Sequence, residues 1–167
     1  MILGPRRLAL IGAIAAVVIV IIAYPYLLLF FSPEIDVEKV SIDLTRVSLA
    51  PESGEQELTL QITFTVANNN DATLTTSKID YELFADGTQV GTGILSYEDV
   101  PVNGRPALFP GSPVPLRDSF VLKYSDEEAE IYNTILTNST QLDWKVTGSA
   151  TIESGTVFVP KEFSDEL

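Results

Sequence analysis

Carboxylates are the side chains of this sequence that could do acid–base chemistry. The 167-residue chain has neither His nor Cys, which excludes a Ser-His-Asp triad, a Cys-His pair and an imidazole or thiolate zinc site. A carboxylate pair could still act as in a glycosidase, and acidic residues gather at Glu98-Asp99 and from Asp126 to Glu130. The second group is better explained as a helix N-terminus, and nothing in the sequence suggests a pocket around either. We therefore expect no catalysis, no cofactor and no small-molecule substrate.

Oxygen ligands for a hard cation are offered by Asn68, Asn69 and Asn70, which precede Asp71. Calcium is the one metal whose ligand preferences fit such oxygens, yet the spacing of an EF-hand is missing. The same residues favour turns, because their short polar side chains hydrogen-bond to nearby backbone and tolerate positive φ. A self-capped turn is the favoured interpretation, and no metal site is predicted.

One modification motif is present. Asn138-Ser139-Thr140 is the only N-x-[ST] sequon in the chain, and we expect it in the loop after a helix, where it would be open to glycosylation if the domain is exported.

The N-terminal part of the chain predicts a membrane anchor. Leu8 to Phe31 is a run of 24 residues without a charge, and as a helix it would span about 36 Å against a hydrocarbon core of about 30 Å. A cleaved signal peptide is the rival, but its apolar region is usually shorter and no small-residue cleavage site precedes Ser32. We therefore expect an uncleaved anchor over residues 1–32 and one domain over residues 33–167.

Charge sets the orientation and limits the partners. Arg6 and Arg7 precede the apolar run, so the positive-inside rule leaves a short N-terminus in the cytoplasm and places the domain on the extracellular or periplasmic side. Without these two arginines the chain has eight basic against 23 acidic residues, a net charge of −15. Such a surface repels nucleic acid, whose binding requires basic side chains. The acidic surface suits either solubility or a high-salt habitat, where salt screens the repulsion between carboxylates.

The strand that organises the rest is Leu58 to Asn70. Apolar and polar residues alternate along it up to Val66, which predicts a half-buried antiparallel strand at the centre of the core. A phase shift near Thr45-Arg46 predicts a β-bulge in the preceding strand. Asp86-Gly87 predicts a hairpin that returns through Val90, Thr92 and Ile94 on the inner face, with Gly91 and Gly93 on the other. Five prolines between Ser96 and Pro115 indicate irregular chain.

One segment has helical spacing. Ser125 followed by Glu128 is a capping-box pattern, and apolar residues then recur with a helical period as far as Asn138. Strand periodicity resumes at Leu142 and Trp144 and ends near Phe163. Seven short strands and one helix predict a mainly β chain, a seven-stranded antiparallel β-sandwich after the transmembrane helix.

Several features of the sequence together resemble a known domain. They are the strand that ends in an Asn-rich turn, the segment Ile79 to Leu83, the turn at Gly87, Val90-Gly91-x-Gly93, Trp144 and Gly155. It is the water-stress and hypersensitive-response (WHy) domain of the folded, type-2 late embryogenesis abundant proteins. The resemblance covers about Val37 to Phe163 and is to a prokaryotic, archaeal-type, membrane-anchored form. The family usually has Asn-Pro-Asn where this chain has Asn68 to Asn70.

The resemblance implies a fibronectin type III-like sandwich without catalysis that acts in tolerance to drying, cold or salt. Two functions stay open. The domain is a stress-protective module at the outer membrane face, near lipid, envelope proteins or stressed client proteins, or it is an immunoglobulin-like interaction domain of an envelope complex. An exposed apolar patch or a free strand edge would favour the second.

Overall fold

The computed structural model describes residues 5–30, 35–54 and 56–167, and in the first helix it describes side chains from residue 12 to residue 26. The chain divides into two compact units, Met1–Glu34 and Ile35–Leu167. The first contains α1 (Pro5–Phe30). The second contains η1 (Val37–Lys39), β1 (Val40–Leu49), β2 (Glu57–Asn68), β3 (Leu74–Ala85), β4 (Thr88–Ser96), η2 (Val102–Gly104), β5 (Ala107–Leu108), β6 (Val114–Lys123), α2 (Ala129–Asn138), β7 (Trp144–Ser154) and β8 (Val157–Glu166).

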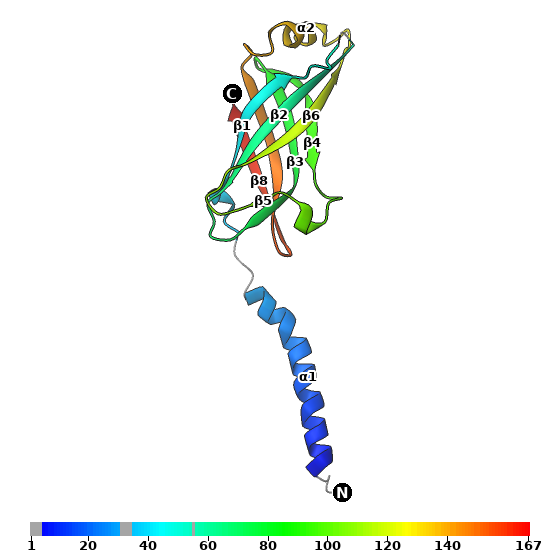
Figure 1. The fold of residues 1–167 in the computed structure, drawn as a ribbon, viewed down its shortest axis with the longest axis vertical. Coiled ribbons are helices and arrows are strands. Elements are labelled where there is room, and N and C mark those ends of the chain that lie inside the picture. Colours follow the sequence, from blue (N-terminus) through cyan, green and yellow to red (C-terminus); the bar gives the residue numbers. More distant parts are fainter. Residues whose placement is uncertain (1–4, 31–34, 55) are drawn as a thin grey trace. The chain divides into compact units, whose positions relative to one another are not determined.

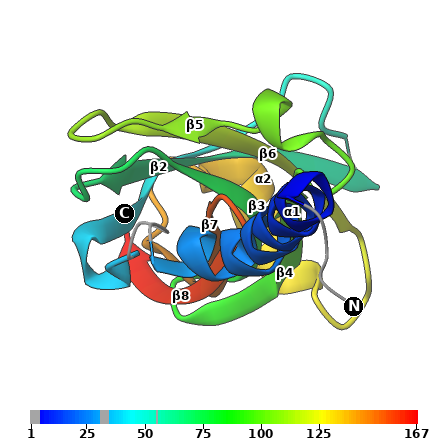
Figure 2. The same cartoon turned by 90° about the horizontal axis from the view of Figure 1, so that it is seen from below.

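The strands form two antiparallel sheets that face each other. One sheet has the order β1-β2-β6, and the other has the order β4-β3-β7-β8 with β5 paired to β3. Figure 1 shows the strands of the second unit, and Figure 2 shows β2 and β6 in one layer and β4 and β8 in the other. The mainly β prediction is confirmed. The strand count differs by the two-residue β5, because Leu74 and Thr75 pair with Leu108 and Ala107 inside the proline-rich segment that we expected to be irregular.

The core is built around β2, as the alternation predicted. Its five inward side chains, Leu58, Leu60, Ile62, Phe64 and Val66, have no exposed surface, and at about 1.5–3 kcal/mol for each buried large side chain they are a major stabilising group. Tyr81 and Phe163 from the other sheet pack edge-to-face on Phe64, with ring centroids 5.1 and 6.0 Å away. β2 therefore joins the two layers.

The predicted bulge in the first strand is confirmed. The register between β1 and β2 shifts between Leu44 and Arg46. At this point the Leu44 N–H donates to the Asp165 Oδ2 of β8 over 2.7 Å. A side chain of one sheet therefore satisfies a backbone group at the edge of the other.

The face assignment of β4 is corrected. Val90 and Leu95 are buried while Thr92 and Ile94 are exposed, so the inner face continues through Gly91 and Gly93. The hairpin does turn at Asp86 and Gly87, both with positive φ. A register shift between Leu83 and Phe84 moves the phase of the returning strand by one residue. The prediction placed the wrong residues on the inner face because the bulge shifts the alternation and the inward glycines have no side chain that would reveal the shift.

The two inward glycines make room for aromatic rings. A Cβ on Gly93 would collide with the ring of Tyr81, and one on Gly91 would lie 2.8 Å from the ring of Phe120. Gly148 lies on the other side of Tyr81 and is paired with Phe163. A Cβ added there would collide with the backbone carbonyl oxygen of Asp80 and would also lie 3.0 Å from the ring of Phe163. Across the larger sheet, aromatic side chains therefore alternate with glycines that they cover.

α1 is one helix of 26 residues with Pro25 inside it. The predicted end of the apolar run, Phe31, and the predicted boundary at residues 32 and 33 lie outside the described residues. Within the part of the chain that the structure describes, no helix was found to be long and apolar enough for a membrane crossing.

The start of α2 is corrected by three residues. Ser125 and Glu128 make one of the two capping-box contacts, because the Glu128 N–H donates to Ser125 Oγ at 3.3 Å. The Glu128 carboxylate accepts from the Ser125 hydroxyl at 3.2 Å and not from the Ser125 backbone N–H that a capping box would use. These contacts close a bend, and the helix begins only at Ala129. Tyr132 and Ile135 then bury its inner face.

Candidate functional site at the Asn68 end of the sandwich

The predicted asparagine turn lies at one end of the sandwich, where several connections meet. We call this the Asn68 end, and it consists of residues 35–39, 68–73, 97–113 and 153–158. The strand register brings these segments together, because Asn68 is paired with Val40, Leu74 with Leu108, and Thr75 with Glu153. This is the end of the sandwich drawn lowest in Figure 1. α2 lies at the opposite end.

The side chain of Asn68 is fully buried and connects three segments. Its Nδ2 donates to the carbonyl oxygens of Ala72 and Leu108, both at 2.8 Å, and its Oδ1 accepts from the Asn70 N–H at 2.9 Å. Its own carbonyl accepts from the Gly111 N–H at 2.7 Å. The Asn68–Asn70 bond is the self-capped turn that we expected. The bonds to Ala72 and Leu108 also attach the proline-rich segment to that turn.

Asn70 holds the chain that enters the domain. Its Oδ1 accepts from the Asp36 N–H and its Nδ2 donates to the Asp36 carbonyl, both at 3.0 Å. Asn69, by contrast, has an exposed side chain, and its N–H donates to the Lys39 carbonyl. The first residues of the domain are therefore fixed in place, because one side chain bonds to both backbone groups of Asp36. Of the oxygens considered as calcium ligands, the side-chain oxygens of Asn68 and Asn70 accept these protein hydrogen bonds.

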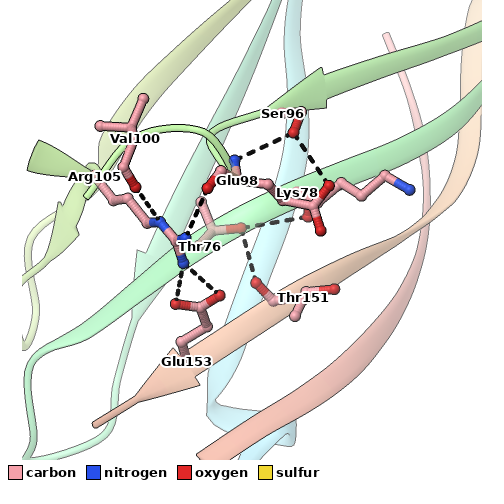
Figure 3. Close-up of polar contacts among 8 residues, drawn as sticks. All are labelled: Thr76, Lys78, Ser96, Glu98, Val100, Arg105, Thr151 and Glu153. Atoms are coloured by element: carbon pink, nitrogen blue, oxygen red, sulfur yellow. Dashed lines mark hydrogen bonds and ion pairs between the residues drawn. The ribbon is translucent and has the colours of Figure 1, made fainter. Parts of the chain in front are cut away.

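A buried ion pair fixes the other side of this end. Arg105 Nη1 contacts both Glu153 oxygens, at 2.7 and 2.6 Å, and the two side chains are only 12% and 3% exposed. The Arg105 Nε and Nη2 donate to the carbonyls of Val100 and Glu98 (Figure 3). Thr76 Oγ1 donates to the Thr151 carbonyl at 3.1 Å, next to the register shift between β3 and β7. The guanidinium of Arg105 thus holds the loop that follows β4, through its bonds to Glu153, Val100 and Glu98.

A second internal polar contact explains an irregularity in β6. Asp118 interrupts the apolar alternation, and its Oδ2 accepts from the Tyr81 hydroxyl over 2.7 Å. Burial, followed by this hydrogen bond and the nearby carboxylate charge, raises the pKa of Tyr81 well above its usual value. The tyrosine is therefore neutral at ordinary pH and donates to the aspartate between the two sheets.

The carboxylates first considered for chemistry are apart from each other. Glu98 and Asp99 lie in the loop at the Asn68 end. At the other end, Asp126 to Glu128 directly precede α2 and Glu130 is in its first turn, and all of these side chains are exposed. Among the described residues, no group of three acidic side chains is placed to hold a metal ion. Asn138 is exposed and is the last residue of α2, so the predicted sequon begins in the helix itself.

Sequence reasoning missed the Arg105–Glu153 pair, the Tyr81–Asp118 bond and the Asp165 contact to β1. Partners 37 to 121 residues apart leave no local spacing signal. Two residues did hint at buried polar contacts. Asp118 occupies an inward position of β6, where an apolar residue is expected, and Glu153 directly follows the buried Ile152 in a strand whose other side chains are mostly small.

No protein-family model matches the chain, and no curated protein matches it. It is similar to three solved structures among others. A protein from Archaeoglobus fulgidus is 20% identical over 74% of this chain and 94% of that one, with a TM-score of 0.46. A protein from Arabidopsis thaliana is 14% identical over 76% of each chain, with a TM-score of 0.45. A protein described as late embryogenesis abundant is 13% identical over 96% of this chain and 87% of that one, with a TM-score of 0.46. Identities and TM-scores in this range assign neither family nor activity.

Proposed function

We propose that the protein is a single-pass membrane protein whose WHy-like β-sandwich protects the outer face of the membrane, without catalysis, during drying, cold or osmotic stress. The observation that carries the proposal is the joining of an apolar helix to a strongly acidic sandwich. The proposal includes the archaeal-type, membrane-anchored form of the family that the sequence resembles.

The anchor is supported by α1. The sequence from Leu8 to Phe31 has no charged residue. Within residues 12–26 of α1, large apolar side chains are exposed, among them Ile14, Val17, Ile19, Val20, Ile21 and Ile22. Successive residues of a helix point in different directions, so between residues 12 and 26 this surface has no charged side to turn toward water. A bilayer would cover it on every side.

The protective role is supported by the surface and interior of the sandwich. A net charge of −15 retains water and counterions around the domain. The internal polar side chains described above are engaged in holding strands and loops together. A hydrated, rigid and chemically inert domain beside lipid fits a role as a spacer that keeps neighbouring surfaces apart as water is lost.

The test is dye retention by vesicles after drying. The full chain is reconstituted into vesicles loaded with a self-quenching dye, and the matched control carries residues 1–34 alone. After drying and rehydration, vesicles with the full chain should retain more dye than the control at equal protein density. Equal leakage would show that the sandwich gives no protection.

A role as an interaction domain is favoured by one observation. β4 is an edge strand of the larger sheet, and its Ile94 side chain is 59% exposed. An edge strand offers unpaired backbone groups to a partner strand. If Ile94→Lys abolished cross-linking to an envelope protein in cells and left dye retention unchanged, this second function would replace the first.

A further inference from the structure

The Asn68 end carries three large apolar side chains that are mostly exposed. Val102, Phe109 and Phe158 are 54%, 57% and 60% exposed. They come from three different segments, namely η2, the chain after β5, and the start of β8. Two exposed phenylalanines at one end of an otherwise strongly acidic domain are costly to keep in water, because each exposes a large apolar ring.

These side chains stand on fixed backbone. Phe158 is paired with Glu153, which holds Arg105, and the Arg105 N–H donates to the Val102 carbonyl. Phe109 follows the fully buried Leu108, whose carbonyl is held by Asn68. The Arg105–Glu153 ion pair and the hydrogen bonds of Asn68 thus also fix the backbone that carries the three exposed apolar side chains.

The chain from α1 enters the domain at this same end. Ile35 packs against the core and Asp36 is held by Asn70 on both sides. Between Phe30 and Ile35 the chain has only five peptide steps, which span at most about 17 Å. If α1 crosses a bilayer as proposed, the Asn68 end is the end of the sandwich that the tether keeps near the membrane surface.

We propose that the Asn68 end is a lipid-docking surface, in which Val102, Phe109 and Phe158 enter the headgroup–acyl boundary of the bilayer that holds α1. This inference rests on the proposed anchoring of α1 and deepens it. Insertion of a few apolar side chains at this depth is how proteins bind an interface without spanning it.

Charge identifies the kind of lipid. Lys39 at this end lies 3.9 Å from Asp36, and Lys161, further along β8, lies 3.4 Å from Glu38 of this end. Each of these lysines thus has an acidic side chain beside it, and the domain as a whole repels anionic headgroups. Docking should depend on apolar insertion and be strongest on zwitterionic phosphatidylcholine.

The experiment uses tryptophan quenching in the full chain reconstituted into phosphatidylcholine vesicles with brominated acyl chains. Single variants Phe158→Trp and Phe109→Trp report the docking surface, and Val121→Trp on β6 is the matched exposed control. Val18→Trp reports α1. The parent chain, whose Trp144 is buried at the other end of the sandwich, supplies the signal to subtract.

Docking predicts that brominated lipid lowers the added emission of Phe158→Trp and Phe109→Trp about twofold and leaves that of Val121→Trp unchanged. Quenching at Val18→Trp without quenching at positions 109 and 158 would overturn the docking surface while leaving the anchor in place. No quenching at Val18→Trp would overturn the anchor and the inference together. Equal quenching at 121, 109 and 158 would also overturn it, because the domain would then lack a preferred end.

Discussion

At the scale of single residues, a few polar side chains inside the sandwich determine where its loops lie. Among the described residues, every buried side-chain nitrogen or oxygen has a hydrogen-bond partner. Asn68 is the clearest case, since one amide holds Ala72, Leu108 and Asn70. A buried donor that loses its partner costs about 1–3 kcal/mol, so these positions tolerate little change.

The change Asn68→Asp tests this network with nearly the same shape. It replaces two amide donors by a carboxylate oxygen that faces two carbonyls, so we expect a loss of about 3 kcal/mol or more in the free energy of unfolding. Asn69→Asp, on an exposed neighbour, should change it by less than about 0.5 kcal/mol. Urea denaturation of the full chain, followed by Trp144 fluorescence, measures both. Similar small losses would mean that Asn68 does not hold the turn.

Ionisation of Tyr81 should lower the free energy of unfolding at alkaline pH. Its pKa is raised in the folded state, first by burial and then by the bond to Asp118, while in the unfolded chain it ionises near its usual value of about 10. Its contribution to stability is therefore complete below pH ~10 and declines above it, by about 1.4 kcal/mol per pH unit. Tyr81→Phe should reduce the slope of unfolding free energy against pH by that amount. An unchanged slope would contradict the assignment.

At the scale of elements, the alternation of apolar and polar residues predicted those strands well in which apolar side chains occupy one face and polar side chains the other. The five inward residues of β2 and the bulge between Leu44 and Arg46 followed from spacing alone, because burial acts on every second residue. The face of β4 could not be read this way. Gly91 and Gly93 have no side chain to reveal an inner face, and the rings that cover them belong to Phe120 and Tyr81, on other strands.

The candidate site was predictable only in its local part. The Asn68–Asn70 turn is a contact across two residues and follows from residue type. The clamp of Asn70 on Asp36, 34 residues away, and the Arg105–Glu153 pair, 48 residues apart, depend on how the sheets bring chain segments together. No spacing rule connects them.

The loop after β4 should depend on its one buried guanidinium. Glu153→Gln removes the charge partner of Arg105, and breaking a buried pair in this way costs about 3–5 kcal/mol. Hydrogen exchange at the amides of Val100, Gly104 and Arg105 should accelerate as the loop opens. The control Glu166→Gln removes an exposed partner of Lys145 and should cost less than about 1 kcal/mol. Equal effects would show that the Arg105–Glu153 pair has no special role.

At the scale of the whole molecule, acidic charge should limit stability at low salt. A net charge of −15 over residues 33–167 means that the carboxylates of the domain repel one another, and salt screens this repulsion as the Debye length falls to ~3 Å at 1 M. The melting temperature of the full chain should therefore rise by several degrees between low salt and 1 M sodium chloride. Sucrose at equal osmolality separates screening from solute exclusion. A flat melting temperature would leave the charge a role in solubility or partner choice alone.

The central claim is that an acidic sandwich must be tethered to a membrane to protect the cell. Survival after drying tests it directly, in cells that lack the gene and are complemented either with the full chain or with residues 33–167 carrying a cleavable export signal. We predict that the full chain restores survival and that the exported, untethered domain does not, at equal protein levels. Equal survival of the deletion strain and the parent, or full rescue by the untethered domain, would contradict the claim.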